Sequence, residues 1–318
     1  MTSPFVLTPH YTQSEATSAS SNSAFAYAIF ATLAFTLAVY LFETYLDLRQ
    51  RSFFFKTEFP TELKSTISKI DAEEKANGKN ATAKDEGEKK LDKSQPLLPQ
   101  LESKFSKSQS YGLDKISFKL FKSLYSLLED CAFLLYGFLP FAWDTACAWG
   151  SKWGHTESDN EIKITLIFLG IMTIIGTITG LPFQLYDTFC IEKKHGFNKQ
   201  TIGLFISDQI KSLLLTAIIG GPFVALLLTI IKWGGPHFYL YVWAFMFAFS
   251  VIMMTIYPVL IMPMFNKYEP LPEGELKNQI YELAGRLKFP LTKLFVMDGS
   301  KRSSHSNAFM FGFFKNKR

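Results

Sequence analysis

The chain is 318 residues long, carries a formal net charge of +5 and is 48% hydrophobic, with 32 Phe. Its apolar residues are concentrated in long runs, which excludes an ordinary soluble domain. Its basic residues flank these runs without interleaved stacking aromatics, which excludes a nucleic-acid-binding protein. The three cysteines, Cys131, Cys147 and Cys190, form no C-x-x-C pair, and an odd number cannot close a disulfide framework. This composition is typical of a membrane protein with reduced thiols.

The first part of the chain predicts one membrane span and a long polar segment. Residues 1–23 form a polar tail without Lys or Arg, so the tail lacks the basic start of a cleaved signal peptide and should stay attached. Residues 24–42 are 19 uncharged residues, enough for a helix to cross a hydrocarbon core of about 30 Å. Residues 63–108 mix both charge signs with Gly, Asn and Ser, so we expect a disordered cytosolic insertion within the membrane domain, 24–262.

Further apolar runs predict four more spans, at 131–150, 164–186, 212–231 and 238–262. Apolar residues at helical spacing from Ile116 onward predict a membrane-surface helix that leads into the first of these runs. Asp144 interrupts that run, and the aromatic residues around it favour a position at the membrane interface. Pro222, Pro258 and Pro263 are expected to kink or end the last two helices. The membrane domain should therefore hold five spans.

The distribution of Lys and Arg predicts the orientation of these spans. Segment 47–122 holds 16 of them, 190–211 holds four and 262–318 holds ten, whereas 1–23 holds none. Because basic residues gather on the cytosolic side of membranes, the N-terminus is expected to be lumenal and residues 263–318 cytosolic. Five spans give this alternation without an exception.

Residues 263–318 predict the start of a small cytosolic α+β domain. A helix at 274–287 is expected to pack on the strands through one apolar face, formed by Leu276, Ile280, Leu283, Ala284 and Leu287. β-Branched and aromatic residues predict one strand at 293–297 and a second at 307–314, with the next turn at 315–317. A strand that lacks its partner leaves unpaired backbone groups, so we expect an incomplete domain in a truncated chain.

The sequence carries no complete catalytic site. It contains no H-E-x-x-H, G-x-S-x-G, P-loop or G-x-G-x-x-G motif, and its five His are scattered. Glu192 and His195 have a spacing that a metal site could use, but they lie at a Lys-rich helix end, where a solvated loop is favoured. A zinc hydrolase needs about three protein ligands and a general base held together, so we predict no catalytic residue and no metal ligand in this chain.

Four stretches resemble type I CAAX prenyl proteases, the integral-membrane zinc metalloproteases that process farnesylated proteins. They read YLFETYLDLRQR at 40–51, LPFQLYDTFCIEKKHGFNKQT at 181–201, YEPLPEG at 268–274 and FPLTKLFVMDGSKRSSHSNAFMFGFFKNKR at 289–318. The resemblance implies an all-α membrane fold in which seven helices, five of them here, surround a water-filled chamber closed by an α+β metalloprotease domain. It implies zinc as the cofactor, with the H-E-x-x-H motif and a further Glu ligand beyond residue 318. It also implies prenylated CAAX proteins as substrates and the endoplasmic reticulum membrane, or also the nuclear envelope, as the location.

The resemblance further implies a substrate-binding strand. In related metalloproteases the S-N-A-x-x-x-G strand lies along the active-site cleft. By this likeness an extended substrate would pair with a wall formed by Ser306, Asn307, Ala308 and Gly312. An alternative for the aromatic residues of this stretch is core and interface packing alone, which concerns Phe309, Phe311, Phe313 and Phe314.

These features leave two classes of function open. The first is the N-terminal membrane portion of a CAAX prenyl protease, inactive alone because it lacks the zinc-binding motif. The alternative is a non-catalytic membrane protein that binds prenylated chains or partner proteins. A transporter or channel is less favoured, because spans three to five hold no ionisable residue in their interiors.

We predict that Asn80 is not glycosylated, although Asn80-Ala81-Thr82 is an acceptor sequon. The basic flanks of the first span hold segment 47–122 in the cytosol, away from the lumenal glycosylation machinery. The measurement is the electrophoretic mobility of the wild type and of Asn80→Gln, each with and without endoglycosidase. A mass shift that disappears in Asn80→Gln would contradict the predicted orientation.

Overall fold

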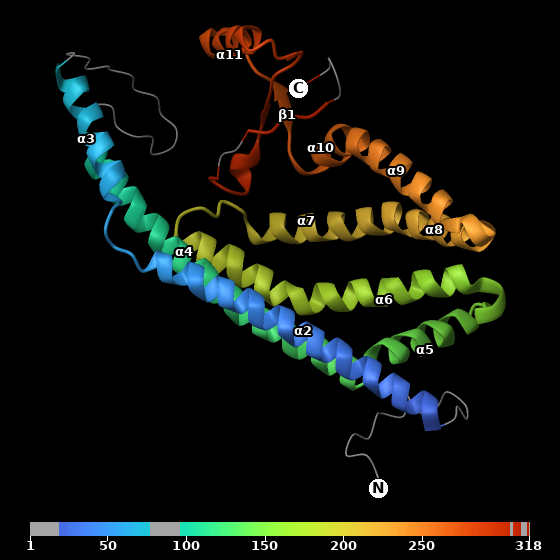
Figure 1. Ribbon diagram of the computed structural model, residues 1–318. Coiled ribbons are helices and arrows are strands. Elements are labelled where there is room, and N and C mark those ends of the chain that lie inside the picture. Colours follow the sequence, from blue (N-terminus) through green and yellow to red (C-terminus); the bar gives the residue numbers. More distant parts are fainter. Residues whose placement is uncertain (1–18, 77–95, 306–307, 313–316, 318) are drawn as a thin grey trace. The chain divides into compact units, whose positions relative to one another are not determined.

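The computed structural model describes residues 19–76, 96–305, 308–312 and 317. Within them the chain is mainly helical, with one small sheet near the C-terminal end (Figure 1). The chain divides into two compact units. The first unit comprises Met1–Phe141 and Leu181–Ile191, and the second comprises Ala142–Gly180 and Glu192–Arg318.

Two long helices of the first unit, α2 (Ala19–Phe54) and α4 (Leu97–Leu135), pack side by side in opposite directions (Figure 1). An ion pair joins them, with Lys119 Nζ 2.7 Å from Asp47 Oδ1. Asp47 is only 8% exposed, whereas the lysine side chain reaches it from the solvent side. A carboxylate placed so deeply needs a nearby cation, so this pair fixes how the two helices align.

The segment predicted to be disordered, 63–108, is helical at both flanks, and the prediction is wrong there. Helix α3 (Thr61–Ala76) packs against the start of α4. The Asp71 carboxylate accepts hydrogen bonds from the first two backbone amides of α4, at 2.8 and 3.1 Å. These amides have no partner within their own helix, so a side chain of α3 caps α4. The centre of the segment, 77–95, lies outside the described residues.

The second predicted span, 131–150, is wrong as a single straight helix. The chain breaks at Tyr136 and Gly137, and α5 (Phe138–Ser151) leaves at an angle of 63° to α4. Gly137 has a φ of 67°, in the left-handed region that favours glycine, so α4 can end there without strain. The helix predicted from Ile116 onward is the second half of α4, and Ile116 is buried in it.

The described helices supply the predicted membrane spans. Four stretches are long and apolar enough to cross a membrane, at Tyr27–Phe54, Glu157–Glu192, Ile202–Trp233 and Gly235–Phe265. A fifth crossing results if the bent pair α4 and α5 is counted as one span, in agreement with the sequence. The second stretch consists of α6 (Glu157–Tyr186) and a π-helical turn, Asp187–Glu192. The chain is therefore a multi-pass membrane protein.

Two further membrane helices, both in the second unit, contain a wide π-helical turn. The first helix consists of α7 (Ile202–Leu215), the π turn Thr216–Gly220 and α8 (Gly221–Trp233). The second consists of α9 (Phe238–Ile256), the π turn Tyr257–Ile261 and α10 (Met262–Phe265). Because proline has no N–H, the carbonyl four residues before it loses its usual partner. For Pro222 and Pro263 these carbonyls belong to Ile218 and Val259, which both lie in the π turns. The helices therefore continue past these prolines through a locally wider turn.

The small sheet confirms one predicted strand and shows a second strand that the sequence analysis did not predict. β2 (Phe295–Met297) pairs antiparallel with β1 (Tyr268–Pro270). The predicted second strand, 307–314, belongs to no sheet over its described residues, 308–312. Two backbone hydrogen bonds of 3.0 and 3.1 Å extend the ladder beyond both ends of β1. β1 thus satisfies backbone groups of β2 that would otherwise lie along an open edge.

Helix α11 (Glu275–Arg286) agrees with the predicted amphipathic helix, but only part of its apolar face is covered. Ala284 is buried and Ile280 is half-buried, whereas Leu276 and Leu283 are 61% and 57% exposed. Strands of three residues are too short to cover a helix of 12. The prediction that the whole face packs on the strands is therefore wrong within the described residues.

We expect Lys119→Met to lower the melting temperature of the purified full chain in detergent more than Lys122→Met does. The first change leaves the shielded Asp47 carboxylate without its cation, at a cost of about 1–3 kcal/mol. Lys122 makes no ion pair within the described residues, so its loss should cost little. The double variant Asp47→Asn/Lys119→Met should recover most of the loss. Equal melting temperatures of the two single variants would show that the ion pair does not hold α2 and α4 together.

Candidate functional site

Arg302 anchors the chain that follows β2. Its guanidinium donates two hydrogen bonds to Asp208 on α7, with Nε 2.7 Å from Oδ2 and Nη2 2.8 Å from Oδ1. A third bond runs from Nη1 to Asn266 Oδ1 at 2.6 Å. The hydrogen bonds to Asp208 raise the pKa of Arg302 above its ordinary value, because the carboxylate stabilises the charged form. The side chains of Arg302 and Asp208 are only 22% and 17% exposed, so this two-pronged contact is strong and directional.

Asp208 is also held by the loop before α7. Thr201 caps the helix, since its Oγ1 accepts a hydrogen bond from a backbone amide of the first turn at 3.3 Å. The Gln200 side chain donates to Asp208 Oδ2 at 3.0 Å. Asn198 in turn accepts a hydrogen bond from the Gln200 backbone amide at 2.7 Å, which makes a compact turn. The carboxylate that receives Arg302 is therefore fixed from a second direction.

Backbone hydrogen bonds join the chain after Arg302 to the same loop. The Lys199 amide donates to the Arg302 carbonyl at 3.0 Å, and the Ser304 amide donates to the Phe197 carbonyl at 2.9 Å. The His305 ring stacks on the Phe197 ring, with 4.1 Å between the ring centroids. The chain is thus fixed to this loop as far as His305.

The spacing of Glu192 and His195 creates no metal site here. Glu192 Oε2 lies 3.4 Å from the Nε2 of His305, and the Glu192 side chain is only 17% exposed. The expectation that Glu192 lies in a solvated loop is therefore wrong. Across the described ranges, no three His, Cys, Asp or Glu side chains lie close enough to hold a metal ion. The described part of the chain does not fit a zinc ion, which takes four ligands.

The four predicted substrate-binding residues come directly after this anchored point. Ser306 and Asn307 lie outside the described residues. Ala308 and Gly312 are exposed and lie in a stretch without regular secondary structure. Gly312 has a φ of 113°, a backbone conformation that favours glycine. Phe309 is 48% exposed, so packing in the core does not account for this aromatic residue.

Lys317 anchors the chain again, in place of the predicted turn at this position. Its carbonyl accepts hydrogen bonds from the backbone amide and the hydroxyl of Thr292, at 2.8 and 2.7 Å. Lys317 also forms a parallel β-bridge with Leu291. The stretch 308–312, in which Phe311 is half-buried and the other four residues are exposed, therefore lies, along the chain, between two anchored residues, His305 and Lys317.

Sequence reasoning missed the contact between Arg302 and Asp208, which lie 94 positions apart. One signal was present, because Asp208 is the one acidic residue of α7, whose other residues are mainly apolar. A carboxylate in such surroundings needs a cation. Spacing alone could not identify which of the ten basic residues in 262–318 supplies it.

Comparisons with known proteins cover both regions of the chain. Residues 93–267 match the family described as CAAX prenyl protease N-terminal, five membrane helices, and residues 270–318 match peptidase family M48. The chain is 47% identical to the CAAX prenyl protease 1 homolog of Arabidopsis thaliana over 89% of its own length. It is 42% identical to the Homo sapiens homolog over 91% of its length. The crystal structure of S. mikatae Ste24p matches 91% of the chain, with a TM-score of 0.74 and 37% identity.

The chain spans 59% of the Arabidopsis protein, 54% of the human protein and 60% of the Ste24p chain. The membrane-family match covers more than half of this chain, and the structural neighbour shares its fold. The expected helical membrane fold with a small α+β region near its end is confirmed, and so is the resemblance drawn from the sequence. The chain therefore belongs to the CAAX prenyl protease family, whose members are membrane-embedded metallopeptidases of family M48.

Proposed function

We propose that this chain is the membrane portion, and the start of the protease domain, of a CAAX prenyl protease that cleaves prenylated CAAX proteins. The observation that carries the proposal is the paired match, in which a membrane-helix family is followed directly by peptidase family M48. The anchored chain around Arg302 supports it, because this contact ties a membrane helix to the region matching the peptidase family.

In this proposal the substrate lies extended against Ser306, Asn307, Ala308 and Gly312. Pairing with an extended chain needs an exposed backbone, and the described members, Ala308 and Gly312, are exposed and lie outside the strands β1 and β2. Arg302 acts as a positioning residue, since it fixes the chain shortly before this stretch. We infer a cytosolic location for residues 263–318 and a lumenal N-terminus, in the endoplasmic reticulum membrane, from the distribution of basic residues.

We further propose that the hydrolysis depends on zinc, the metal that the family resemblance implies. Family membership supports a metal-dependent protease. The zinc ligands would come from parts of the longer relatives that this chain does not span. This chain would then contribute substrate binding and the membrane domain.

We expect residues 1–318 alone neither to retain stoichiometric zinc nor to cleave a farnesylated CAAX peptide. Co-expression with the remaining C-terminal part of the Arabidopsis relative should restore both, because that protein is 47% identical over the shared region. The measurements are metal content by elemental analysis and peptide cleavage with and without a chelator. Chelator-sensitive cleavage by purified 1–318 alone would show that its catalytic residues have been misassigned.

We expect Arg302→Lys to reduce cleavage by the co-expressed pair roughly tenfold or more, because small displacements of a substrate-positioning element cost large factors in rate. Lysine keeps the charge but cannot bond Asp208 through two nitrogens. The matched control is Lys301→Gln, which removes the neighbouring cation from an exposed pair with Asp298. The pair's zinc content should not change in either variant. A normal cleavage rate for Arg302→Lys would refute the positioning role.

A further inference from the structure

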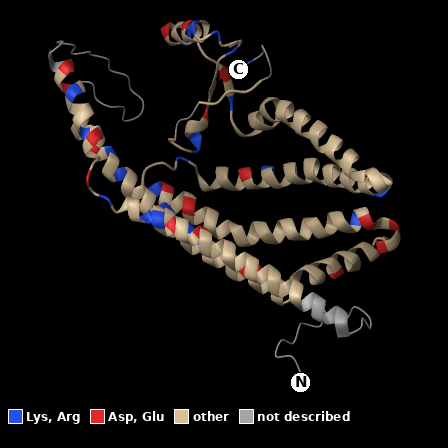
Figure 2. Cartoon of the chain, viewed as in Figure 1, with Lys and Arg blue, Asp and Glu red and all other residues tan. Residues whose placement is uncertain are grey.

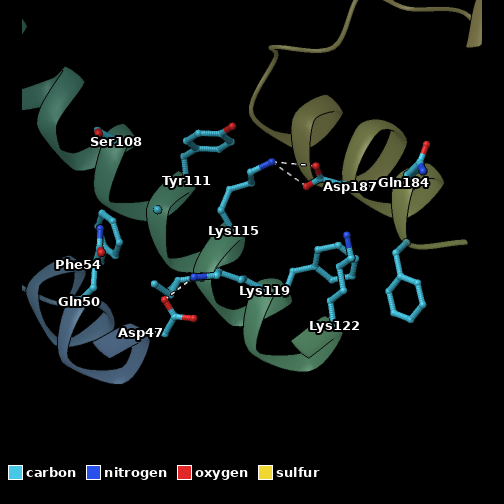
Figure 3. Close-up of a pocket in the computed structure, with 14 residues that line it drawn as sticks. Asp47, Gln50, Phe54, Ser108, Tyr111, Lys115, Lys119, Lys122, Gln184 and Asp187 are labelled. Carbon is cyan, nitrogen blue, oxygen red and sulfur yellow. Dashed lines mark hydrogen bonds and ion pairs between the residues drawn. The ribbon is translucent and has the colours of Figure 1, made fainter. Parts of the chain in front are cut away.

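The first unit contains a pocket of about 670 Å³ that no part of the proposed function uses. It is lined by the end of α2, the middle of α4 and the stretch from Phe183 to Asp187, all within the same unit (Figure 3). The walls differ in chemistry, because the lysines all come from α4, whereas aromatic rings come from all three elements. Such a lining fits a ligand that is both charged and apolar.

Three lysines of α4, Lys115, Lys119 and Lys122, line the pocket. Their spacings of four and three residues place them on one face of the helix. Lys115 Nζ lies 2.8 Å from Asp187 Oδ1, and Lys119 forms the ion pair with Asp47. The pocket therefore holds three cations against two carboxylates, and it retains one positive charge.

That remaining charge is accessible from outside the pocket. Lys122 is exposed and makes no ion pair with any residue that the structure describes. The Lys119 side chain is 61% exposed although its ammonium reaches Asp47. In Figure 3 dashed lines join Lys119 to Asp47 and Lys115 to Asp187, whereas none reaches Lys122. Ammonium groups with this exposure can donate hydrogen bonds to an incoming anion.

Aromatic side chains supply the apolar part of the lining. Phe54 comes from α2, Phe118 from α4 and Phe183 from the end of α6. The rings of Phe118 and Phe183 lie 6.2 Å apart, and Tyr125 extends this cluster, with its ring 4.7 Å from that of Phe183. The cluster lies on the same part of α4 as Lys119 and Lys122. A hydrocarbon chain could therefore follow the rings from a headgroup held by the lysines.

The pocket lies where the membrane helix α2 becomes charged. The apolar part of α2 holds no Lys or Arg before Arg49, and Arg51 and Lys56 follow shortly after (Figure 2). A transition of this kind marks the level of the lipid headgroups. Basic pockets between membrane helices at that level are suited to anionic headgroups, and each lysine near the surface adds to the attraction.

We propose that this pocket binds one anionic phospholipid. The headgroup phosphate accepts hydrogen bonds from Lys119 and Lys122, and the acyl chains lie along the Phe118 and Phe183 rings. Asp47 and Asp187 keep Lys119 and Lys115 in place and limit the surplus charge to about that of one phosphodiester. This site is independent of proteolysis and needs no residue of the proposed substrate strand.

The test is native mass spectrometry of the purified full chain, titrated with phosphatidylglycerol or with zwitterionic phosphatidylcholine. We expect phosphatidylglycerol to bind more tightly, and Lys122→Gln to weaken its binding about fivefold. Lys122→Arg should retain the affinity. Asp187→Asn should strengthen binding, because it removes a negative charge from the pocket. The matched control is Lys107→Gln, an exposed lysine of α4 outside the pocket, which should change nothing.

A second arm adds inorganic phosphate to the wild type carrying phosphatidylglycerol. Displacement of the lipid would show that the pocket recognises the phosphate group itself, and retention would show that the acyl chains contribute to binding. Both results support the site if Lys122→Gln weakens the lipid complex. Equal affinities of the wild type and Lys122→Gln, or an equal loss in Lys107→Gln, would overturn the proposal.

Discussion

The contact between Arg302 and Asp208 is the constraint on which the C-terminal part of the structure depends. The two residues are 94 positions apart, and Asn266, 36 positions before Arg302, accepts a third hydrogen bond from the same guanidinium. One side chain thus joins a membrane helix, the end of the last membrane helix and the region matching the peptidase family. Because a planar guanidinium with two bonds to one carboxylate permits little rotation, the chain that follows starts from a defined position.

A comparable arrangement holds the first unit together. Asp47 meets Lys119 and Asp187 meets Lys115, so one face of α4 is tied to two other helical segments. Charged contacts suit this region better than apolar ones, since apolar packing gains little where lipid chains surround a helix equally well. The same lysines leave a surplus charge at headgroup level, which connects the packing of the helices to the proposed lipid site.

The sequence predicted the membrane spans well because they depend on apolar length alone, and β2 and α11 because their patterns are local. It failed where distant residues decide the structure. The cap that Asp71 provides for α4 lies in a polar stretch whose composition indicates disorder. The break at Gly137 depends on a backbone conformation, and the pairing of β1 with β2 depends on which strand comes close enough. Of the candidate site, the sequence pointed to the stretch from Ser306 to Gly312, whose role in substrate binding stays a prediction, but to neither Arg302 nor the loop that holds it.

The π-helical turns change how the faces of the membrane helices should be assigned. A π turn accommodates one more residue than an α-helical turn, so the residues beyond it are rotated by about 100° from their regular positions. A helical wheel drawn continuously from α7 through Thr216–Gly220 would therefore place the side chains of α8 on the wrong side. The same applies to α10 beyond Tyr257–Ile261. Lipid-facing and interior-facing positions have to be read separately on the two sides of each turn, whether from crosslinking or from tolerance to substitution.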